Sequence, residues 1–334
     1  MAIEKNKSRI AVVLINLGTP DAPTVPAIRR YLAEFLSDPR VVNIPRLVWL
    51  PILYLVILAF RPRIIVHKYK LIWGTHDGPI RNITRALAAR TQRLVKFEHP
   101  EANISVEAAM TYGEPSVDSI MADLCKEGVS AFLFLPLYPQ YSIATTAAAH
   151  DVVRRALSNS PVSNLGFISD YHEQPTYIAS VASSIQAYTR YLKNGAMLVF
   201  SFHGIPIVQA EKGDPYPAQC ARTASLVASH LGLKDNEWML SFQSRFGPSP
   251  WLTPYTSEVM AALPKQGTDS VVVVCPGFAT DCLETIEEIK VLNRDLFLGA
   301  GGKRFKYVKA LNATDNHARM VASIIDEYLF QDEN

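Results

Sequence analysis

The amino-acid sequence predicts a doubly wound α/β protein. Runs of consecutive apolar, β-branched residues recur along the chain, and amphipathic helical patterns separate them. Uninterrupted apolar strands that alternate with helices are typical of parallel sheets covered by helices on both faces. The chain has 334 residues, of which 49% are hydrophobic and 19% charged, which is enough for two such domains with substantial cores.

Eight strands are expected along the chain, each a short apolar run. They cover residues 10–17, 104–110, 129–137, 165–168, 197–202, 238–242, 271–275 and 307–311. The helices expected between them include 82–97, 117–126, 145–157, 177–192, 218–231 and 281–296. No low-complexity linker interrupts this alternation.

The chain also repeats itself. Ile15-Asn-Leu-Gly-Thr-Pro20 and Ser201-Phe-His-Gly-Ile-Pro206 each place a Gly-x-Pro turn after an apolar strand. A looser match pairs Met110-Thr-Tyr-Gly-Glu-Pro-Ser116 with Ser244-Arg-Phe-Gly-Pro-Ser249. Such a repeat indicates two similar Rossmann-like domains, 1–160 and 161–334, with the active-site cleft between them. Leu17 and His203 would then face this cleft from equivalent positions, and the last helix is expected to pack back on the first domain.

Charge, cysteines and glycines exclude several classes of function. With 33 basic and 31 acidic residues the net charge is +2, which gives no reason to expect a nucleic-acid partner. The four cysteines form no Cys-x-x-Cys pair, and no signal peptide precedes the first strand, so a cytoplasmic location is expected. No phosphate-binding glycine motif follows a strand; Gly299-Ala-Gly-Gly-Lys303 comes before one, which argues against dinucleotide binding.

One segment, 47–60, is uncharged and rich in Leu, Ile, Tyr and Trp, with Arg46 before it and Arg61 and Arg63 after it. Its 14 residues are too few for a helix that crosses a bilayer, which needs about 20, and Pro51 is expected to interrupt it. The composition of this segment allows two interpretations. It is either an ordinary buried helix or an interfacial segment that enters lipid headgroups or lines an apolar pocket.

Candidate catalytic residues follow two of the predicted strands. His203 ends an apolar strand directly before Gly204, where its side chain can accept a proton near neutral pH. After the strand 271–275, a helix opened by Asp281 carries Glu284 and Glu288 on one face. Their mutual repulsion should raise the pKa of at least one carboxyl, and such a ladder can pass metal ions or protons.

Each candidate also has an ordinary structural explanation. A single histidine is usually a core residue hydrogen-bonded to backbone, and acidic residues near the start of a helix usually form a solvated face favoured by the helix dipole. The position of both candidates at carboxyl ends of apolar strands, where open α/β sheets bind ligands, favours a site.

Together these motifs resemble the ferrochelatase family. The resemblance rests on Ser201-Phe-His-Gly-Ile-Pro206, Gly213-Asp-Pro-Tyr216, Ser241-Phe-Gln-Ser-Arg-Phe-Gly247, Trp251-Leu-Thr-Pro254 and Pro276-Gly-Phe-Ala-Thr-Asp-Cys-Leu-Glu-Thr-Ile-Glu-Glu288. Leu135-Pro-Leu-Tyr-Pro-Gln-Tyr-Ser142 and Leu311-Asn-Ala-Thr314 extend it, from residue 14 to about residue 330.

The resemblance implies the class II chelatase fold and the insertion of ferrous iron into protoporphyrin IX, with release of two protons. His203 matches the family histidine that accepts protons and contacts the metal, and Glu284 matches the family glutamate, with Glu288 continuing an acidic track. Leu17, Tyr112 and Tyr138 would contact the porphyrin. Segment 47–60 matches the family's hydrophobic lip, which favours peripheral association with the inner face of the cytoplasmic membrane.

The sequence departs from the family in two places. Animal members use one cysteine after the Tyr-Pro-Gln-Tyr-Ser motif and three late ones to hold a [2Fe–2S] cluster; Ile143 occupies the first place here and no cysteine follows Cys282, so no cluster is expected. His76 and Asp77 stand where many members have Gly-Gly-Ser-Pro, which bears on propionate contacts. The alternatives are coproporphyrin III as substrate, a chelatase for cobalt or nickel, and a non-catalytic porphyrin- or heme-binding paralogue.

Overall fold

The computed structural model describes residues 9–330 except 75, 76, 159, 161 and 248, and it divides the chain into two units. Unit 1 consists of Met1–Tyr138, Ser142–Asp170 and Ala313–Asn334, and unit 2 of Pro139–Tyr141 and Tyr171–Asn312. Each unit contains a four-stranded sheet in which every pairing is parallel. The predicted α/β class with two parallel sheets is therefore confirmed.

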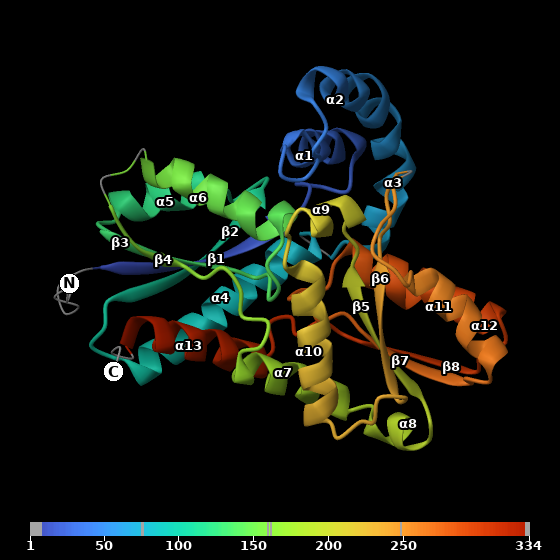
Figure 1. Cartoon of the computed structure of the whole chain (residues 1–334). Coiled ribbons are helices and arrows are strands. Elements are labelled where there is room, and N and C mark those ends of the chain that lie inside the picture. Colours follow the sequence, from blue (N-terminus) through green and yellow to red (C-terminus); the bar gives the residue numbers. More distant parts are fainter. Residues whose placement is uncertain (1–8, 75–76, 159, 161, 248, 331–334) are drawn as a thin grey trace. The chain divides into compact units, whose positions relative to one another are not determined.

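In unit 1 the sheet has the order β2-β1-β3-β4. Its strands are β1 (Ile10–Gly18), β2 (Ile104–Tyr112), β3 (Ala131–Pro136) and β4 (Ser163–Phe167). Helices cover both faces, α5 and α6 on one and α4 and α13 on the other (Figure 1). The helices and π-helical turns of the unit are α1 (Val25–Ser37), α2 (Arg46–Ile52), η1 (Leu53–Ile57), α3 (Leu58–Ile72), α4 (Pro79–Glu98), α5 (Val117–Lys126), η2 (Ile143–Ala147), α6 (Ala148–Ser158) and α13 (Asp315–Phe330).

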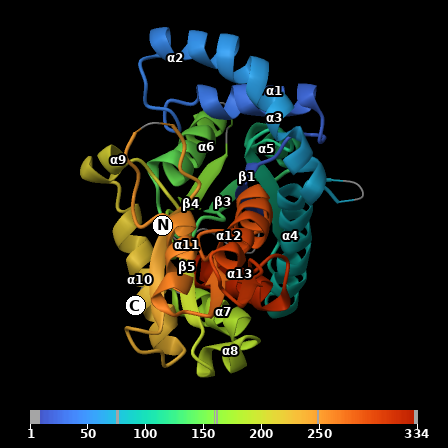
Figure 2. The same cartoon turned by 90° about the vertical axis from the view of Figure 1, so that its right-hand side faces the viewer.

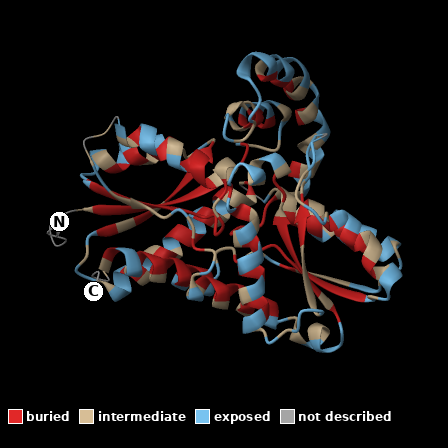
Figure 3. Cartoon of the chain, in the orientation of Figure 1, coloured by how far each residue is buried: buried red, intermediate tan, exposed pale blue. Residues whose placement is uncertain are grey.

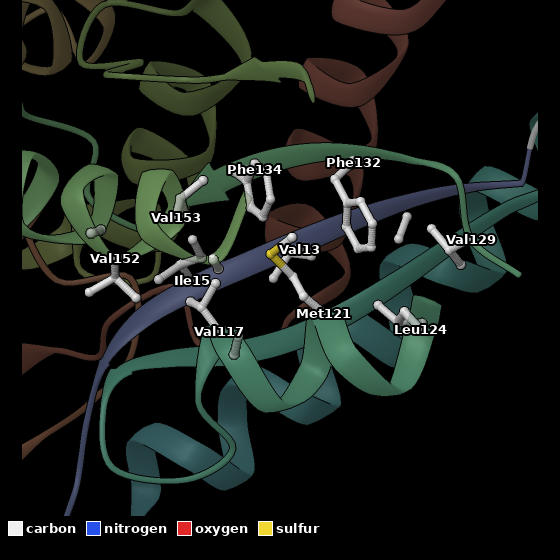
Figure 4. Packing of buried hydrophobic residues seen from close by; sticks show 14 of the residues in the cluster. Val13, Ile15, Val117, Met121, Leu124, Val129, Phe132, Phe134, Val152 and Val153 are labelled. Atoms are coloured by element: carbon white, nitrogen blue, oxygen red, sulfur yellow. The ribbon is translucent and has the colours of Figure 1, made fainter. Parts of the chain in front are cut away.

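The core between this sheet and α5 and α6 follows from the two-residue period of the strands. Val13 and Ile15 of β1 project toward Met121 of α5, beside Phe132 and Phe134 of β3 (Figure 4). The residues between them in the strands, such as Val12 and Leu14, are buried on the opposite face. Burial of one such side chain stabilises the fold by about 1.5–3 kcal/mol. The continuous red strands of Figure 3 show that the central strands are buried on both sides.

Unit 2 has the strand order β6-β5-β7-β8. Its strands are β5 (Met197–His203), β6 (Trp238–Gln243), β7 (Ser270–Val274) and β8 (Arg304–Val308). On one face, Val271 and Val273 of β7 pack in a cluster with Met260 of α11 and Phe297 of α12. The helical segments of the unit are α7 (Pro175–Gln186), α8 (Thr189–Lys193), α9 (Ile207–Glu211), α10 (Tyr216–His230), α11 (Thr256–Ala262), η3 (Leu263–Gln266), η4 (Glu284–Asn293) and α12 (Arg294–Gly299).

The two sheets repeat the same topology, strand for strand. Asn16 of β1 pairs with Met110 of β2, and Phe202 of β5 pairs with Phe242 of β6. Leu17 follows Asn16, and His203 follows Phe202. The two residues therefore occupy equivalent positions in the register of the two sheets, as predicted.

The looser part of the predicted repeat is wrong. The amide of Met110 donates to the carbonyl of Pro115 over 2.7 Å, and in the second half the amide of Phe242 donates to the carbonyl of Pro254 over 2.9 Å. The counterpart of Pro115 is thus Pro254 and not a residue of 244–249. A longer loop follows β6 than follows β2, and this loop carries Ser244 and Trp251.

The last helix belongs to unit 1, although it ends the chain. α13 lies beside α4 (Figure 1), and Arg90 of α4 forms an ion pair with Asp315 while His99 contacts Asp326 over 2.7 Å. β4 forms the edge of the first sheet, so unit 1 continues to Asp170, beyond the boundary at residue 160 expected from the sequence.

Segment 47–60 lies inside one continuous helix, Arg46–Ile72, made of α2, η1 and α3. Pro51 does not interrupt it as expected: the proline lies inside α2, and the helix continues through the wider turn η1. By length and composition this 27-residue helix is sufficient to cross a membrane, with 22% of its most apolar window buried. It stands at one end of unit 1 with α1 (Figure 2).

Three other predicted elements differ in detail. The predicted helix 177–192 is divided into α7 and α8. The predicted helix 281–296 begins at Glu284 as the π-helical segment η4 and continues as α12. The predicted strand 307–311 is β8, Arg304–Val308, three residues earlier. β8 is an edge strand in which Arg304 and Lys306 alternate with Phe305 and Tyr307, so it lacks the continuous apolar run used to locate buried strands.

Candidate active site

His203 is the last residue of β5, at the carboxyl edge of the second sheet. Its Nδ1 lies 2.6 Å from the backbone carbonyl oxygen of Gly204. Because a carbonyl oxygen only accepts hydrogen bonds, Nδ1 carries the proton and Nε2 keeps its lone pair. The histidine is half-buried and is thereby held in the tautomer that can accept a proton at Nε2.

The turn after His203 favours glycine because the backbone approaches β6 closely. A Cβ at Gly204 would lie 3.1 Å from the carbonyl oxygen of Gln243 and 3.2 Å from the ring of Trp251. Trp251 in turn packs near the histidine, with 6.2 Å between the two ring centroids. The indole Nε1 of Trp251 is buried and has no hydrogen-bond partner in the described part of the chain, so it is a donor available to a bound group.

Glu288 is held by Ser244 from the loop after β6. The amide of Ser244 donates to one carboxylate oxygen over 2.7 Å, and its hydroxyl donates to the other over 2.5 Å. Ser244 has a φ of 65°, a left-handed conformation that costs a residue with a Cβ about 1–3 kcal/mol. The two hydrogen bonds to Glu288 offset this cost. The strained loop thus holds the carboxylate of Glu288 in place through these hydrogen bonds.

Burial is the main reason why the pKa of Glu288 is raised above its usual value. The hydrogen bonds from Ser244 and the positive charge of protonated His203 oppose this rise, whereas the charge of Glu284 adds to it. His203, Glu284 and Glu288 thus lie close enough for their charges to interact.

Glu284 starts η4, and its backbone carbonyl accepts a hydrogen bond from the Gln243 side chain over 2.9 Å. Gln243 also accepts from the hydroxyl of Ser201 over 2.7 Å, so a buried polar network links β5, β6 and the first turn of η4. π-helical turns within helices often occur at functional sites. Here the turn sets the spacing of the two glutamates, in place of the α-helical face expected from the sequence.

Cys282, next to this acidic turn, is not a thiolate ligand. Burial raises its pKa well above the usual value, and the neighbouring Glu284 carboxylate raises it further. The thiol therefore stays protonated, whereas a metal-binding cysteine is ionised.

The described residues contain no group of three or more His, Cys, Asp or Glu side chains arranged to hold a metal ion. The second sheet therefore offers a basic nitrogen and two carboxylates near one another rather than a closed metal cage.

The other three predicted site residues belong to unit 1 and lie at the carboxyl edge of its sheet. Leu17, half-buried at the end of β1, packs against the same apolar cluster as Tyr138, which follows β3. Tyr112 ends β2, is only 3% exposed, and donates its hydroxyl to Asp38 over 2.8 Å. Burial raises the pKa of both tyrosines, so both stay neutral. That Leu17 and His203 face each other stays a prediction.

Of the unusual pair in the turn before α4, His76 lies outside the described residues. Asp77 accepts from the amide of Gly78 over 2.7 Å and pairs with Arg81 over 3.3 Å and with Arg85 over 3.4 Å. Asp77 thus bridges two guanidinium groups at the start of α4.

Sequence analysis did not assign roles to Ser244, Gln243 or Trp251, although all three lie in quoted motifs. The left-handed backbone at Ser244 and the close approach of Gly204 to β6 bring them to the histidine and the glutamates. No spacing rule predicts these contacts, since they join loops that follow different strands.

Known proteins resemble this chain over nearly its whole length. The ferrochelatase family model matches residues 9–329. The chain belongs to the ferrochelatase family. It is 48% identical over 323 residues to the ferrochelatase of Methylococcus capsulatus, which covers 96% of this chain and 97% of that protein. It is 42% identical to the coproporphyrin III ferrochelatase of Streptococcus mutans, over 97% of this chain and all of that protein (100%).

Among solved structures, SirB from Bacillus subtilis with Fe³⁺ matches with a TM-score of 0.56 at 12% identity, over 96% of both chains. At this identity the match shows a shared fold. The predicted resemblance, the α/β fold and the assignment as an iron-inserting metal chelatase of heme biosynthesis are confirmed by these comparisons.

Proposed function

We propose that this ferrochelatase inserts Fe²⁺ into protoporphyrin IX to give protoheme. The observation that carries the mechanism is the fixed tautomer of His203, whose Nδ1 contacts the Gly204 carbonyl over 2.6 Å. In the proposed step Nε2 accepts a proton from a pyrrole nitrogen as the iron–nitrogen bonds form, and the second pyrrole proton leaves through the carboxylates of Glu284 and Glu288. Before it enters the ring, the substrate iron exchanges some of its water ligands for these same carboxylate oxygen atoms.

Anaerobic iron insertion, followed by absorbance with protoporphyrin IX and coproporphyrin III in parallel, tests this proposal. His203→Ala should lower the rate by about 10²- to 10⁴-fold, the usual contribution of a general base. His230→Ala, a change at an exposed histidine of α10, is the matched control and should keep the rate. Faster turnover of coproporphyrin would redirect the substrate assignment, and tight porphyrin binding without turnover would indicate a carrier.

We further propose that the helix Arg46–Ile72 lies on the cytoplasmic face of the membrane. Leu47 is 93% exposed and Leu55 73% exposed, and the helix carries basic residues at Arg46, Arg61, Arg63, Lys68 and Lys70 but no acidic one. Its other side is attached to unit 1, because the Trp49 indole donates to Leu36 over 2.7 Å. An apolar face with basic flanks is typical of helices that lie in the headgroup layer.

Co-sedimentation with vesicles that contain anionic lipid tests this membrane contact. The double variant Leu47→Glu, Leu55→Glu should stay in the supernatant, whereas Phe97→Glu, a change at an apolar residue of α4 that is 84% exposed, should leave binding intact. Equal sedimentation of wild type and the double variant would contradict the proposal.

We also propose that the enzyme works without an iron–sulfur cluster. Cys125 lies in α5 of unit 1 and Cys220 in α10 of unit 2, and Cys275 and Cys282 are buried between β7 and η4; all four are free thiols. Iron and sulfide analysis of protein purified without oxygen checks this, and stoichiometric acid-labile sulfide would overturn it.

A further inference from the structure

A pocket of unit 2 has no part in the chemistry described above. It has a volume of about 590 Å³, which is within the range of small-molecule sites. Arg190 and Tyr191 of α8 line it, together with Arg294 of α12 and Arg304 and Lys306 of β8. The remaining lining residues are Asn194, Leu298, Lys303 and Phe305.

This pocket, here called the basic pocket, lies at the opposite end of the second sheet from His203. Arg304 is the first residue of β8, and Asn194 precedes the first residue of β5, whereas His203 is the last residue of β5. Figure 1 accordingly shows α8 near the start of β5 and α9 beyond its end. A ligand in the basic pocket is therefore separate from the reacting centre of this unit.

The charge of the basic pocket is unusual for this chain. Five of the lining residues are Lys or Arg and none of those described is acidic, although the whole chain is nearly balanced at +2. Two of the five have acidic partners outside the lining, because Arg294 pairs with Asp295 over 2.8 Å and Lys303 with Asp269 over 2.6 Å. Arg190, Arg304 and Lys306 have no carboxylate partner in the part of the chain that the structure describes.

Tyr191 contacts two of these three unpaired cations. Arg190 donates to its hydroxyl over 2.8 Å, and Lys306 lies 5.0 Å from the centre of its ring. The hydrogen bonds from both cations lower the pKa of Tyr191. Like charges gathered around one neutral ring repel one another, so an anion that enters the pocket relieves this repulsion.

We propose that the basic pocket binds a small molecule that carries two or more linked phosphates. Three of its five cations are arginines, whose planar guanidinium groups match pairs of phosphate oxygens. One phosphate neutralises at most two of the three unpaired cations, so a chain of phosphates is the better complement. The glycine-rich run that ends at Lys303 leads into this pocket, and no phosphate-binding glycine motif is needed because side chains supply the contacts.

Isothermal titration of the purified full chain with inorganic tripolyphosphate, ATP and AMP tests this proposal. The triple variant Arg190→Gln, Arg304→Gln, Lys306→Gln should bind tripolyphosphate at least about tenfold more weakly, because each removed bond is charge-assisted. The matched control Arg93→Gln, Arg319→Gln, Lys234→Gln removes the same charges from exposed positions elsewhere and should bind like wild type.

The ligand series identifies the source of the phosphates. Equal binding of ATP and tripolyphosphate indicates that the phosphate chain alone is recognised, and tighter binding of ATP indicates that the nucleoside also contacts the pocket near Leu298 and Phe305. AMP should bind more weakly than either. Equal binding by wild type and the triple variant, or no binding by wild type at low salt, would overturn the proposal. Iron insertion should be unchanged in the triple variant, so failure here is distinct from failure of the proposed catalytic function.

Discussion

Glu288 shows how one carboxylate combines opposing effects. Burial and the charge of Glu284 favour its protonated form, whereas Ser244 and protonated His203 favour the ionised form. Burial prevails, so the pKa is higher in the folded than in the unfolded protein. As the pH rises from about 4.5, the unfolded state ionises first, and the folded state loses stability until the folded pKa is passed.

Glu288→Gln should remove this loss. We expect the variant to gain thermal stability relative to wild type as the pH rises from 4.5 to 7, since the amide cannot ionise. Thermal unfolding measured at several pH values checks this. A constant difference between the two proteins across that range would contradict it.

Ser244→Ala should raise the pKa of the Glu288 carboxyl further. Removing the hydroxyl that donates to Glu288 over 2.5 Å takes away a contact that lowers the pKa. The acid limb of the pH–rate profile for iron insertion should therefore move to higher pH. In the double variant with Glu288→Gln no such movement is expected, because the titrating group is gone; a shift that persists would assign the limb to another residue.

At the scale of single elements, the end of β1 depends on Gly18. Its φ of 111° is unfavourable for other residues, and a Cβ there would lie 1.8 Å from the carbonyl oxygen of Tyr112. Gly18→Ala must therefore push β1 and β2 apart where Leu17 and Tyr112 are positioned. We expect a loss of at least about 3 kcal/mol in the free energy of unfolding, measured by urea denaturation.

Gly299→Ala serves as the control for that experiment. Gly299 ends α12, and nothing lies within 4 Å of a Cβ added there. Alanine is favoured over glycine in a helix by about 1 kcal/mol, so stability should stay the same or rise slightly. A similar loss in both variants would show that the contact with Tyr112 is not the cause.

At the scale of the whole molecule, the end of the chain completes the fold of its beginning. α13 packs on α4 within unit 1, and one face of α13 is buried, including Val321 with 0% exposure. Val321→Asp would place a charge in this core, and we expect a loss above about 4 kcal/mol or failure to fold. Arg319→Asp, on the exposed side of the same helix, should fold normally, as judged by circular dichroism and thermal unfolding. Equal stability of both variants would contradict this role for α13.

Much of this architecture was predictable from local pattern. Apolar runs located seven of the eight strands to within two residues at each end, since buried parallel strands must be apolar on both faces. β8 was displaced because an edge strand bears charges on alternate residues. The repeat predicted the equivalence of Leu17 and His203, but it misplaced the counterpart of Pro115, because an insertion after β6 changes the spacing without changing the strand pairing.

The order of residues was enough to predict the alternation of strands and helices, the family, the histidine at the end of β5 and the glutamates after β7. These depend on residue type and on neighbours along the chain. Three features became visible in the folded chain alone: the tautomer of His203, the hydrogen bonds from Ser244 to Glu288, and the cluster of unpaired cations in the basic pocket. Each of these joins residues from different elements or depends on a backbone angle, and hydrogen bonds and charges act through distances that the order of residues alone does not specify.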